Sequence, residues 1–174
     1  MTRSVSLLGS GIFFIVAPAV VAGWVPWALT RWRLQPAFLG SAALRWLGGA
    51  LIAAGAVIVL ESFVRFAVKG LGTPAPVAPT QFLVVSGLYR YVRNPMYVGV
   101  VSVIVGQALA LGSVVLLEYG ALVWLSFFAF VVLYEEPSLQ RRFGASYESY
   151  RVGVRRWWPR LTPWQPPISS MSTR

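Results

Sequence analysis

The segment VVLLEYGALVWLSFFAFVVLYEE, from Val114 to Glu136, is apolar along most of its length and ends in the adjacent carboxylates of Glu135 and Glu136. A helix of about 20 apolar residues crosses the hydrocarbon core of a bilayer, which is about 30 Å thick. The run from Val114 to Tyr134 has this length and lacks the period-two alternation of a barrel strand. It therefore predicts a membrane-spanning helix that brings two carboxylates to one membrane edge.

Three other stretches are apolar and long enough, or nearly long enough, to span a membrane as helices. They are Leu7 to Leu29, Leu44 to Ala67 and Pro95 to Leu111. The first is too long for the core of a signal peptide and lacks a small-residue cleavage site, so we expect a retained span with kinks at Pro18 and Pro26. We predict an all-α fold, a polytopic bundle of about four transmembrane helices in a single domain covering residues 1–174.

The composition also places the chain in a bilayer, since 57% of the residues are hydrophobic, 11% are charged and the mean hydropathy is +0.67. The net charge of +10 would suggest nucleic-acid binding in a soluble protein. Here most basic residues flank apolar runs, where they contact lipid head groups, so we expect membrane lipids and no nucleic acid as partners. The absence of His and Cys excludes disulfides, thiolate nucleophiles and imidazole ligands, and we expect no metal site.

The positions of the basic residues predict the orientation of the spans. They concentrate around the central loop and in the tail, which would share the cytoplasmic side with Arg3 near the N-terminus, while Arg31, Arg33 and Arg45 fall on the opposite side of the membrane. Cytoplasmic segments carry an excess of Lys and Arg. We therefore expect both termini, the central loop and the functional site at the cytoplasmic face.

Small residues predict where the spans touch, because helices in lipid pack through residues that let their backbones approach. Such residues share one face of the third span and recur four apart in the second. They are Gly99, Ser102, Gly106 and Ala110 in the third span, and the pairs Gly49/Ala53 and Ala50/Ala54 in the second. Gly112-Ser113 separates the third and fourth spans and predicts a tight hairpin.

The segment between the second and third spans contains several helix breakers. The stretch from Gly70 to Thr80 is rich in Gly and Pro, which predicts an extended cytoplasmic loop, either a linker or a flap over a site. Further on, Pro95 suits the first turn of a helix and Asn94 suits the cap before it. The third helix is therefore expected to start at this pair.

The tail after Pro137 combines apolar residues at helical spacing with charges. This spacing predicts a cytoplasmic amphipathic C-terminal helix at the membrane interface. Its apolar residues are Leu139, Phe143, Tyr147 and Tyr150, and a group of tryptophans beyond it, Trp157, Trp158 and Trp164, resembles a head-group anchor.

Three of the five acidic residues have structural explanations. Glu61 lies four residues before Arg65, which is the favoured order for an ion pair within a helix. Glu118 fits the outer membrane interface, and Glu148 fits the polar face of the tail helix. The adjacent pair at the end of the fourth span remains.

Glu135 and Glu136 need compensation by cations, because adjacent carboxylates repel each other and resist burial. A bound cationic ligand could provide it, or a cluster of arginines could, and the spacing alone leaves both interpretations open. The candidate arginines are Arg90, Arg93, Arg141 and Arg142.

Aromatic residues expected at the same membrane edge favour a ligand. Tyr89, Tyr91 and Tyr97 offer π faces and hydroxyls to a sulfonium or ammonium group. Arg93 could pair with a ligand carboxylate through its forked guanidinium. S-adenosylmethionine (SAM) is a zwitterion with an additional positive charge and matches this pattern.

These residues belong to an ordered series of motifs over roughly residues 81–163. The series comprises Leu83-Val84, Ser86-Gly87-Leu88-Tyr89, Arg93-Asn94-Pro95-Met96-Tyr97-Val98-Gly99, Glu135-Glu136, Leu139, Phe143-Gly144 and Tyr147/Tyr150. As a set, it closely resembles the isoprenylcysteine carboxyl methyltransferase family, which is related to the phospholipid methyltransferases.

The resemblance implies a SAM-dependent integral membrane methyltransferase, with the cofactor on the cytoplasmic side and a lipophilic substrate that enters from the bilayer. Family cofactor contacts map onto Gln81, Phe82, Leu83, Val84, Tyr89, Asn94, Pro95, Met96, Tyr97 and Glu135. Arg93 and Glu136 belong to the same motifs and join the predicted cofactor-binding set.

Three positions depart from the family pattern. Asn94 and Gln81 stand where family members have His, and both can hydrogen-bond a cofactor but cannot carry a proton at neutral pH. Val131 stands one turn before Glu135, where eukaryotic prenylcysteine enzymes place an Arg for the substrate carboxylate. This last departure argues against prenylcysteine itself as the acceptor.

The expected reaction is direct transfer of the SAM methyl group to an oxygen, nitrogen or sulfur of a lipophilic or amphipathic acceptor. O-methylation of a carboxylate, on a prenylcysteine-like or other lipid, is favoured because an ionised carboxylate needs no general base. The sequence assigns no catalytic residue.

Two alternatives belong to other classes of protein. Membrane NADPH-dependent sterol-type reductases share a Pro-x-Tyr-x-Gly segment, but they follow it with an acidic residue where this chain has Val100, and they use His in later motifs. A non-catalytic membrane protein could keep the same fold.

Overall fold

The computed structural model describes residues 16–69, 83 and 85–166, with side chains described only to residue 65 in the first range. The expectations for the start of the first span, for the loop 70–80 and for Gln81, Phe82 and Val84 lie outside these residues. The described chain is helical and contains no strand, which confirms the all-α prediction for this part. In chain order the elements are η1 (Val20–Trp24), α2 (Val25–Thr30), η2 (Phe38–Gly40), α3 (Ala42–Lys69), η3 (Gly87–Arg90), α4 (Pro95–Leu111), α5 (Val114–Phe130), η4 (Val131–Glu135) and α6 (Glu136–Gly153).

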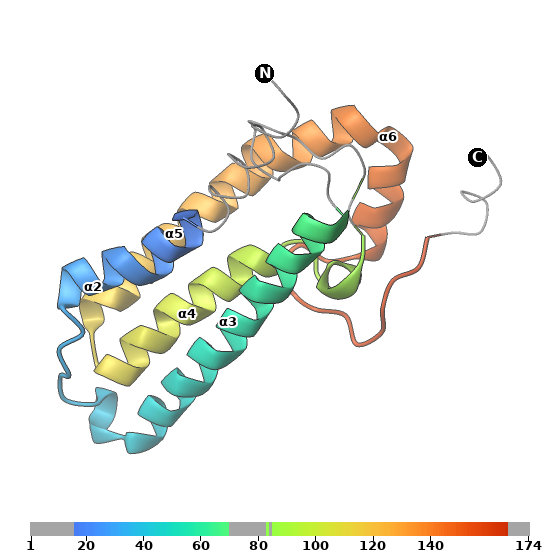
Figure 1. The fold of residues 1–174 in the computed structure, drawn as a ribbon. Helices are drawn as coiled ribbons and strands as arrows, with labels where there is room; N and C mark the ends of the chain where they lie inside the picture. The colour runs from blue at the N-terminus through green and yellow to red at the C-terminus, as the bar shows by residue number, and fades with distance from the viewer. Residues whose placement is uncertain (1–15, 70–82, 84, 167–174) are drawn as a thin grey trace.

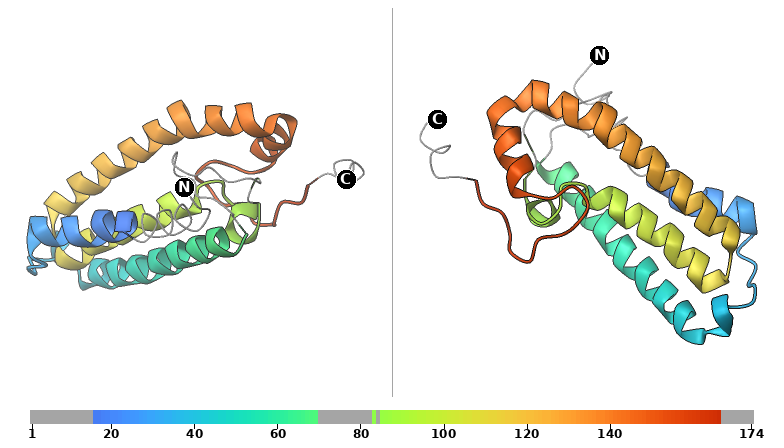
Figure 2. Two further views of the ribbon diagram at one scale, coloured as in Figure 1. Left: turned by 45° about the horizontal axis from the view of Figure 1, so that its top comes forward. Right: turned by 180° about the vertical axis from the view of Figure 1, so that it is seen from behind.

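Helices α3 and α4 form the closest pair, lying side by side along most of α4 (Figures 1 and 2). A Cβ atom added to Gly55 would lie 2.6 Å from the carbonyl oxygen of Gly99, and one added to Gly106 would lie 2.7 Å from that of Gly48. The backbones therefore touch at both points, and any side chain there would force them apart. We call this contact the glycine seam.

The glycine seam confirms the predicted face of α4 but not that of α3. Gly99 and Gly106 lie in it, as expected. The residues predicted on α3 are wrong, because Gly49, Ala53, Ala50 and Ala54 are exposed. Gly48 and Gly55 face α4 instead. Helix α3 carries small residues around much of its circumference, so spacing alone did not identify the contact face.

The hairpin between α4 and α5 is as tight as expected. Gly112 adopts the left-handed conformation (φ 72°) that ends α4, and Ser113 begins α5 by accepting a hydrogen bond from the backbone N–H of Leu116. A Cβ atom on Gly112 would also collide with the carbonyl of Pro36. Glycine is required here for both reasons.

Helix α2 packs against this hairpin. The hydroxyl of Tyr119 donates to the carbonyl of Val21 at 2.8 Å, and the side chain of Gln107 donates to that of Ala22 at 2.7 Å. These carbonyls lie in the π-helical turn η1, just before Pro26, where the regular helical bonding pattern changes. The buried core lies along α4 between its neighbours and contains Val100, Ile104 and Val123.

Helix α5 continues through the π-turn η4 into α6 as one long curved rod (Figures 1 and 2). The rod bends sharply at Gly144, whose φ of 50° and ψ of −123° break the helical path, so that the end of α6 returns toward η3. Tyr147 and Tyr150 are buried there with Val154, and Leu139 and Phe143 pack against them. The four residues predicted to share a face therefore join one cluster, although the helix that carries them is not straight.

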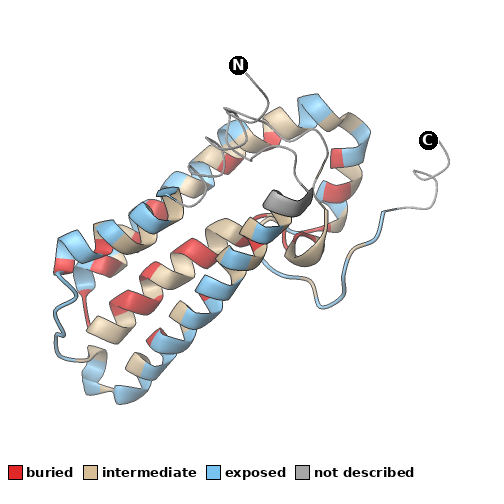
Figure 3. Cartoon of the chain, in the orientation of Figure 1, coloured by how far each residue is buried: buried red, intermediate tan, exposed pale blue. Residues whose placement is uncertain are grey.

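Apolar side chains cover the outside of the helices. Figure 3 shows long exposed faces on α3 and α5, whereas buried residues concentrate along α4. Two segments are long and apolar enough to cross a membrane, Ala42–Arg65 and Val114–Gly153, and the apolar helices Val16–Thr30 and Pro95–Leu111 are shorter. Exposed leucines such as Leu122 and Leu125 are stable in lipid and costly in water.

Candidate functional site

The polar residues gather at one end of the bundle. Four elements meet there, namely the turn η3, the first turn of α4, the junction of η4 with α6, and the segment from Val154 to Trp164, which we call the tail strap. In Figure 1 the tail strap passes beside η3 after α6 has turned back.

Glu136 is the centre of an ion network. Its Oε1 accepts a hydrogen bond from Nη1 of Arg93 at 2.8 Å, and both of its carboxylate oxygens accept from the guanidinium of Arg156 at 2.7 Å. The side chains of Glu136 and Arg93 are only 11% and 9% exposed. Arg93 also donates to the hydroxyl of Tyr147 at 3.1 Å. We call Glu136, Arg93 and Arg156 the Glu136 network.

The charges in this network compensate one another. Hydrogen bonding to Glu136 raises the pKa of the Arg156 guanidinium above its usual value, so Arg156 keeps its charge. Arg93 pairs with Glu136, as expected if arginines compensate the carboxylate pair, whereas Arg90 bonds elsewhere and Arg141 and Arg142 are exposed. The pairing of Arg93 with a ligand carboxylate stays a prediction. Arg156 was not predicted from the sequence, because nothing in its spacing distinguishes it from the other arginines of the tail.

Glu135 has different surroundings. Side chains of adjacent helical residues leave the axis about 100° apart, so Glu135 points away from the network. Its Oε2 accepts a hydrogen bond from the hydroxyl of Tyr97 at 2.9 Å, and the Tyr97 ring packs against Phe127 with 4.7 Å between ring centroids. Within the described residues, no Lys or Arg forms an ion pair with this half-buried carboxylate.

The tail strap holds the loop before α4 through backbone hydrogen bonds. The N–H groups of Arg93, Arg160 and Trp164 donate to the carbonyls of Arg155, Tyr91 and Arg90 at 3.0, 2.9 and 2.9 Å. Nε of Arg90 returns a bond to the carbonyl of Trp164 at 2.7 Å. The loop is thus clamped from residue 90 to residue 93.

Asn94 also belongs to this clamp. Pro95 begins α4 as predicted, but the side chain of Asn94 does not cap the helix. It donates instead to the carbonyl of Arg156 at 3.2 Å. The prediction of a cap rested on bonds to nearby backbone groups. The side chain instead bonds to a partner 62 residues away in the chain.

Two of the three tryptophans predicted as a head-group anchor are engaged inside the protein. Trp157 packs against Trp124 of α5 with 4.6 Å between ring centroids, and Trp164 packs against Tyr150 at 5.5 Å. Trp158 is 73% exposed and remains available to a membrane interface. The tail strap is therefore fixed to both α5 and α6.

Tyr89 lies buried between the network and α3. The Tyr150 hydroxyl donates to its carbonyl at 2.6 Å, and burial raises the pKa of the Tyr89 phenol well above its ordinary value of 10.0. The negative charges of Glu135 and Glu61 add to this rise, so both carboxylates lie within electrostatic range of Tyr89. Tyr89 therefore stays a neutral phenol.

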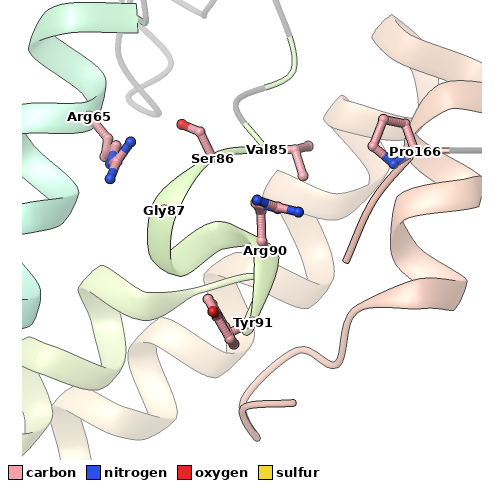
Figure 4. Close-up of a pocket in the computed structure, with 7 residues that line it drawn as sticks. All are labelled: Arg65, Val85, Ser86, Gly87, Arg90, Tyr91 and Pro166. Atoms are coloured by element: carbon pink, nitrogen blue, oxygen red, sulfur yellow. The ribbon is translucent and has the colours of Figure 1, made fainter. Parts of the chain in front are cut away.

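A cavity of about 470 Å³ lies on the other side of η3, toward the end of α3 (Figure 4). Glu61 and Arg65 form the predicted ion pair beside it, at 2.7 Å. Gly87 turns the chain with a φ of 58°, and a Cβ atom there would collide with this pair. The residues that line the cavity are Arg65, Val85, Ser86, Gly87, Arg90, Tyr91 and Pro166.

The structure brings many of the predicted cofactor residues together, but not all. Tyr97 contacts Glu135 and Arg93 contacts Glu136, with Asn94, Pro95 and Met96 between them in the chain. Leu83 packs on the cluster of Tyr147, Tyr150 and Val154, on the α6 side. Val131 is fully buried at the start of η4. In the described part of the chain, no group of three His, Cys, Asp or Glu side chains could hold a metal ion.

Comparison with known proteins identifies a family for this chain. A Schizosaccharomyces pombe protein named protein-S-isoprenylcysteine O-methyltransferase is 42% identical over 72 residues, which is 41% of this chain and 30% of that relative. The chain therefore matches less than a third of the relative's length. No solved structure matches it. Residues 43–146, from the start of α3 to the second half of α6, match the phospholipid methyltransferase family, and by this match the chain belongs to that family of membrane methyltransferases.

Proposed function

We propose that this protein is a SAM-dependent integral membrane methyltransferase that acts on a lipophilic or amphipathic acceptor. The observation that carries the proposal is Glu135, a half-buried carboxylate with a tyrosine partner and no cationic partner among the described residues. A carboxylate in this position is costly unless a cation joins it. The positive groups of SAM would supply that charge.

The residues fit the cofactor in specific ways. Glu135 would bind a positively charged or hydroxyl-bearing part of the cofactor through the oxygen that Tyr97 leaves free. Tyr97 would fix the direction of that carboxylate. Tyr89, Met96 and the backbone around Asn94 and Pro95 would line the site, together with Gln81, Phe82, Leu83 and Val84.

Arg93 and Glu136 would contribute in another way. Each already has a charged partner, so we assign them to positioning the loop before α4 rather than to direct contact with the cofactor. Loss of either would move Asn94, Pro95 and Tyr97 relative to Glu135.

SAM supplies the activated methyl group when it is bound. The chain would orient acceptor and cofactor for in-line attack and exclude water from the site. A carboxylate acceptor would be ionised and need no base, which suits a sequence without His, so O-methylation remains the favoured reaction. Val131 is buried and apolar, so it offers no positive charge to a substrate carboxylate, and we propose a prenylcysteine-like or other lipid rather than prenylcysteine itself as the acceptor.

The topology that goes with this proposal has four spans in one domain, residues 1–174, with both termini and the site at the cytoplasmic face. The basic residues around η3 and the tail strap support this orientation. The half of α6 after Gly144 would lie along the membrane interface and carry Trp158 toward the head groups.

Calorimetry of the detergent-purified full chain with S-adenosylhomocysteine tests cofactor binding. We expect saturable binding to one site, and no binding at millimolar ligand to folded protein would overturn the proposal. Incubation with methyl-labelled SAM and a lipid extract of the host then identifies the acceptor, because the lipid that gains label is the substrate. A mixture with NADPH in place of SAM should show no spectral change.

A further inference from the structure

The cavity beside η3 belongs to no step proposed above, and its lining is basic. Two guanidinium groups border it from different elements, Arg65 from the end of α3 and Arg90 from η3. Figure 4 shows both around the turn at Gly87, with Ser86 next to it. At about 470 Å³ the cavity has room for a lipid head group.

The donors of these side chains are only partly used. Nε of Arg65 donates a hydrogen bond to the carboxylate of Glu61 at 2.7 Å, and Nε of Arg90 donates one to the carbonyl of Trp164 at 2.7 Å. The Nη groups of both form no hydrogen bond with the described residues. The hydroxyl of Ser86 is buried and has no hydrogen-bond partner among the residues that the structure describes. Guanidinium forks and a hydroxyl suit the oxygens of a phosphate.

The net charge of the cavity matches a single anion. Arg65 and Arg90 contribute two positive charges, and Glu61 offsets one of them through its ion pair with Arg65. One positive charge remains, which equals the charge of a phosphodiester with opposite sign.

The level of the cavity in the membrane indicates which source of anions it meets. The apolar segment Ala42–Arg65 ends at the residue that lines the cavity. The end of a membrane-spanning helix lies at the level of the lipid head groups, where anionic phospholipids concentrate and attract basic side chains.

We propose that the cavity formed by Arg65, Ser86 and Arg90 binds the phosphate of an anionic phospholipid head group. The site is separate from the proposed cofactor site, because Glu135 lies at the end of η4 and none of the described residues assigned to the cofactor lines this cavity. It binds lipid whether or not the chain transfers methyl groups.

Titration of the detergent-purified full chain with short-chain phosphatidylglycerol, phosphatidylcholine and inorganic phosphate tests this site. We expect phosphatidylglycerol to bind most tightly, because phosphatidylcholine adds a positive charge and free phosphate lacks the apolar anchor. Arg65→Gln should weaken phosphatidylglycerol binding about tenfold, because it removes one guanidinium and leaves the carboxylate of Glu61 unpaired. The double variant Glu61→Gln/Arg65→Gln keeps the net charge of the cavity but also loses this guanidinium, so it should weaken binding by a smaller factor. Arg90→Lys should weaken it less, since one ammonium replaces the fork.

Arg141→Gln is the matched control, because Arg141 is exposed on α6 and does not line the cavity. Wild-type affinity in both Arg65 variants would overturn the proposal, and so would an equal loss in Arg141→Gln, which would indicate diffuse attraction. Inorganic phosphate that binds as tightly as phosphatidylglycerol would overturn the assignment to a lipid. Binding of S-adenosylhomocysteine, measured on the same samples, reports on the cofactor site separately and verifies that each variant is folded.

Discussion

Glu135 and Glu136 are neighbours in the chain, but their surroundings differ in every respect that matters for charge. Glu136 is bound by two arginines from the loop before α4 and from the tail strap, and its side chain is 11% exposed. Glu135 accepts a hydrogen bond from Tyr97, whose ring packs on Phe127, and it has no ion pair among the described residues. The network uses the charge of Glu136 to join three segments, whereas Glu135 takes no part in it and is the carboxylate that we propose binds the cofactor. Four substitutions test this difference, taken from the largest expected effect to the smallest.

Glu136→Ala should lower the free energy of unfolding by about 3–5 kcal/mol, because Arg93 would remain buried without its counter-charge. Thermal unfolding in detergent measures the change. Glu148→Ala removes an exposed carboxylate that also pairs with an arginine, and it should change stability little. Equal effects of the two substitutions would contradict a structural role for Glu136.

Glu135→Gln should weaken the binding of S-adenosylhomocysteine about 100-fold, since the amide keeps the shape but loses the charge. Stability should change little, because the amide oxygen can still accept the Tyr97 hydrogen bond. Calorimetry and thermal unfolding on one preparation separate the two quantities. Glu118→Gln, on the exposed side of α5, is the control and should alter neither. If Glu135→Gln unfolded the protein as Glu136→Ala does, the distinction between the two carboxylates would fail.

Arg156→Gln should cost about 2 kcal/mol of stability, less than Glu136→Ala, because Arg93 continues to compensate the carboxylate. Arg156→Lys should recover only part of the loss, since an ammonium cannot reproduce the fork onto both oxygens. The neighbouring Arg155 has an exposed side chain, and Arg155→Gln should be neutral. Chemical unfolding of the three variants side by side would show whether the fork matters or only the charge of the tail.

Tyr97→Phe removes a single hydrogen bond to Glu135 and should reduce cofactor affinity several-fold, about 1 kcal/mol. The ring should stay packed on Phe127, so the free energy of unfolding should move by less than the affinity. Tyr134→Phe serves for comparison, as its ring is partly exposed on the same rod. A loss of affinity as large as that of Glu135→Gln would mean that the tyrosine itself is the main ligand contact.

The features that the sequence predicted well depend on short-range chemistry. Apolar runs predicted the helices α3, α4 and α5, and Gly112-Ser113 predicted the hairpin between the last two. The four-residue spacing predicted the Glu61–Arg65 ion pair. Each of these is decided by residues within a few positions of one another. The ordered motifs from Leu83 to Tyr150 were sufficient to indicate the family, and the match over residues 43–146 confirmed it.

The features that it missed depend on long-range contacts. Asn94 bonds to a carbonyl 62 residues away, and Glu136 pairs with an arginine 20 residues beyond it. The prediction of which face of α3 meets α4 was wrong by one position. Which residues let the two backbones approach depends on the rotation of each helix about its axis. Neither a distant partner nor a helix rotation leaves a local signal in the sequence.

The tail strap has a consequence for biosynthesis. Arg90 and Trp164 bond to each other across 74 residues of chain, and Arg156, Arg160 and Trp164 all lie beyond the part that matches the family. At synthesis rates of 5–20 residues per second, roughly 4 to 15 seconds separate the appearance of these partners. The helices can enter the membrane during that interval while the loop before α4 still lacks its hydrogen bonds to the tail strap. A ribosome that stops before Trp164 would therefore leave an inserted protein with an unfinished site.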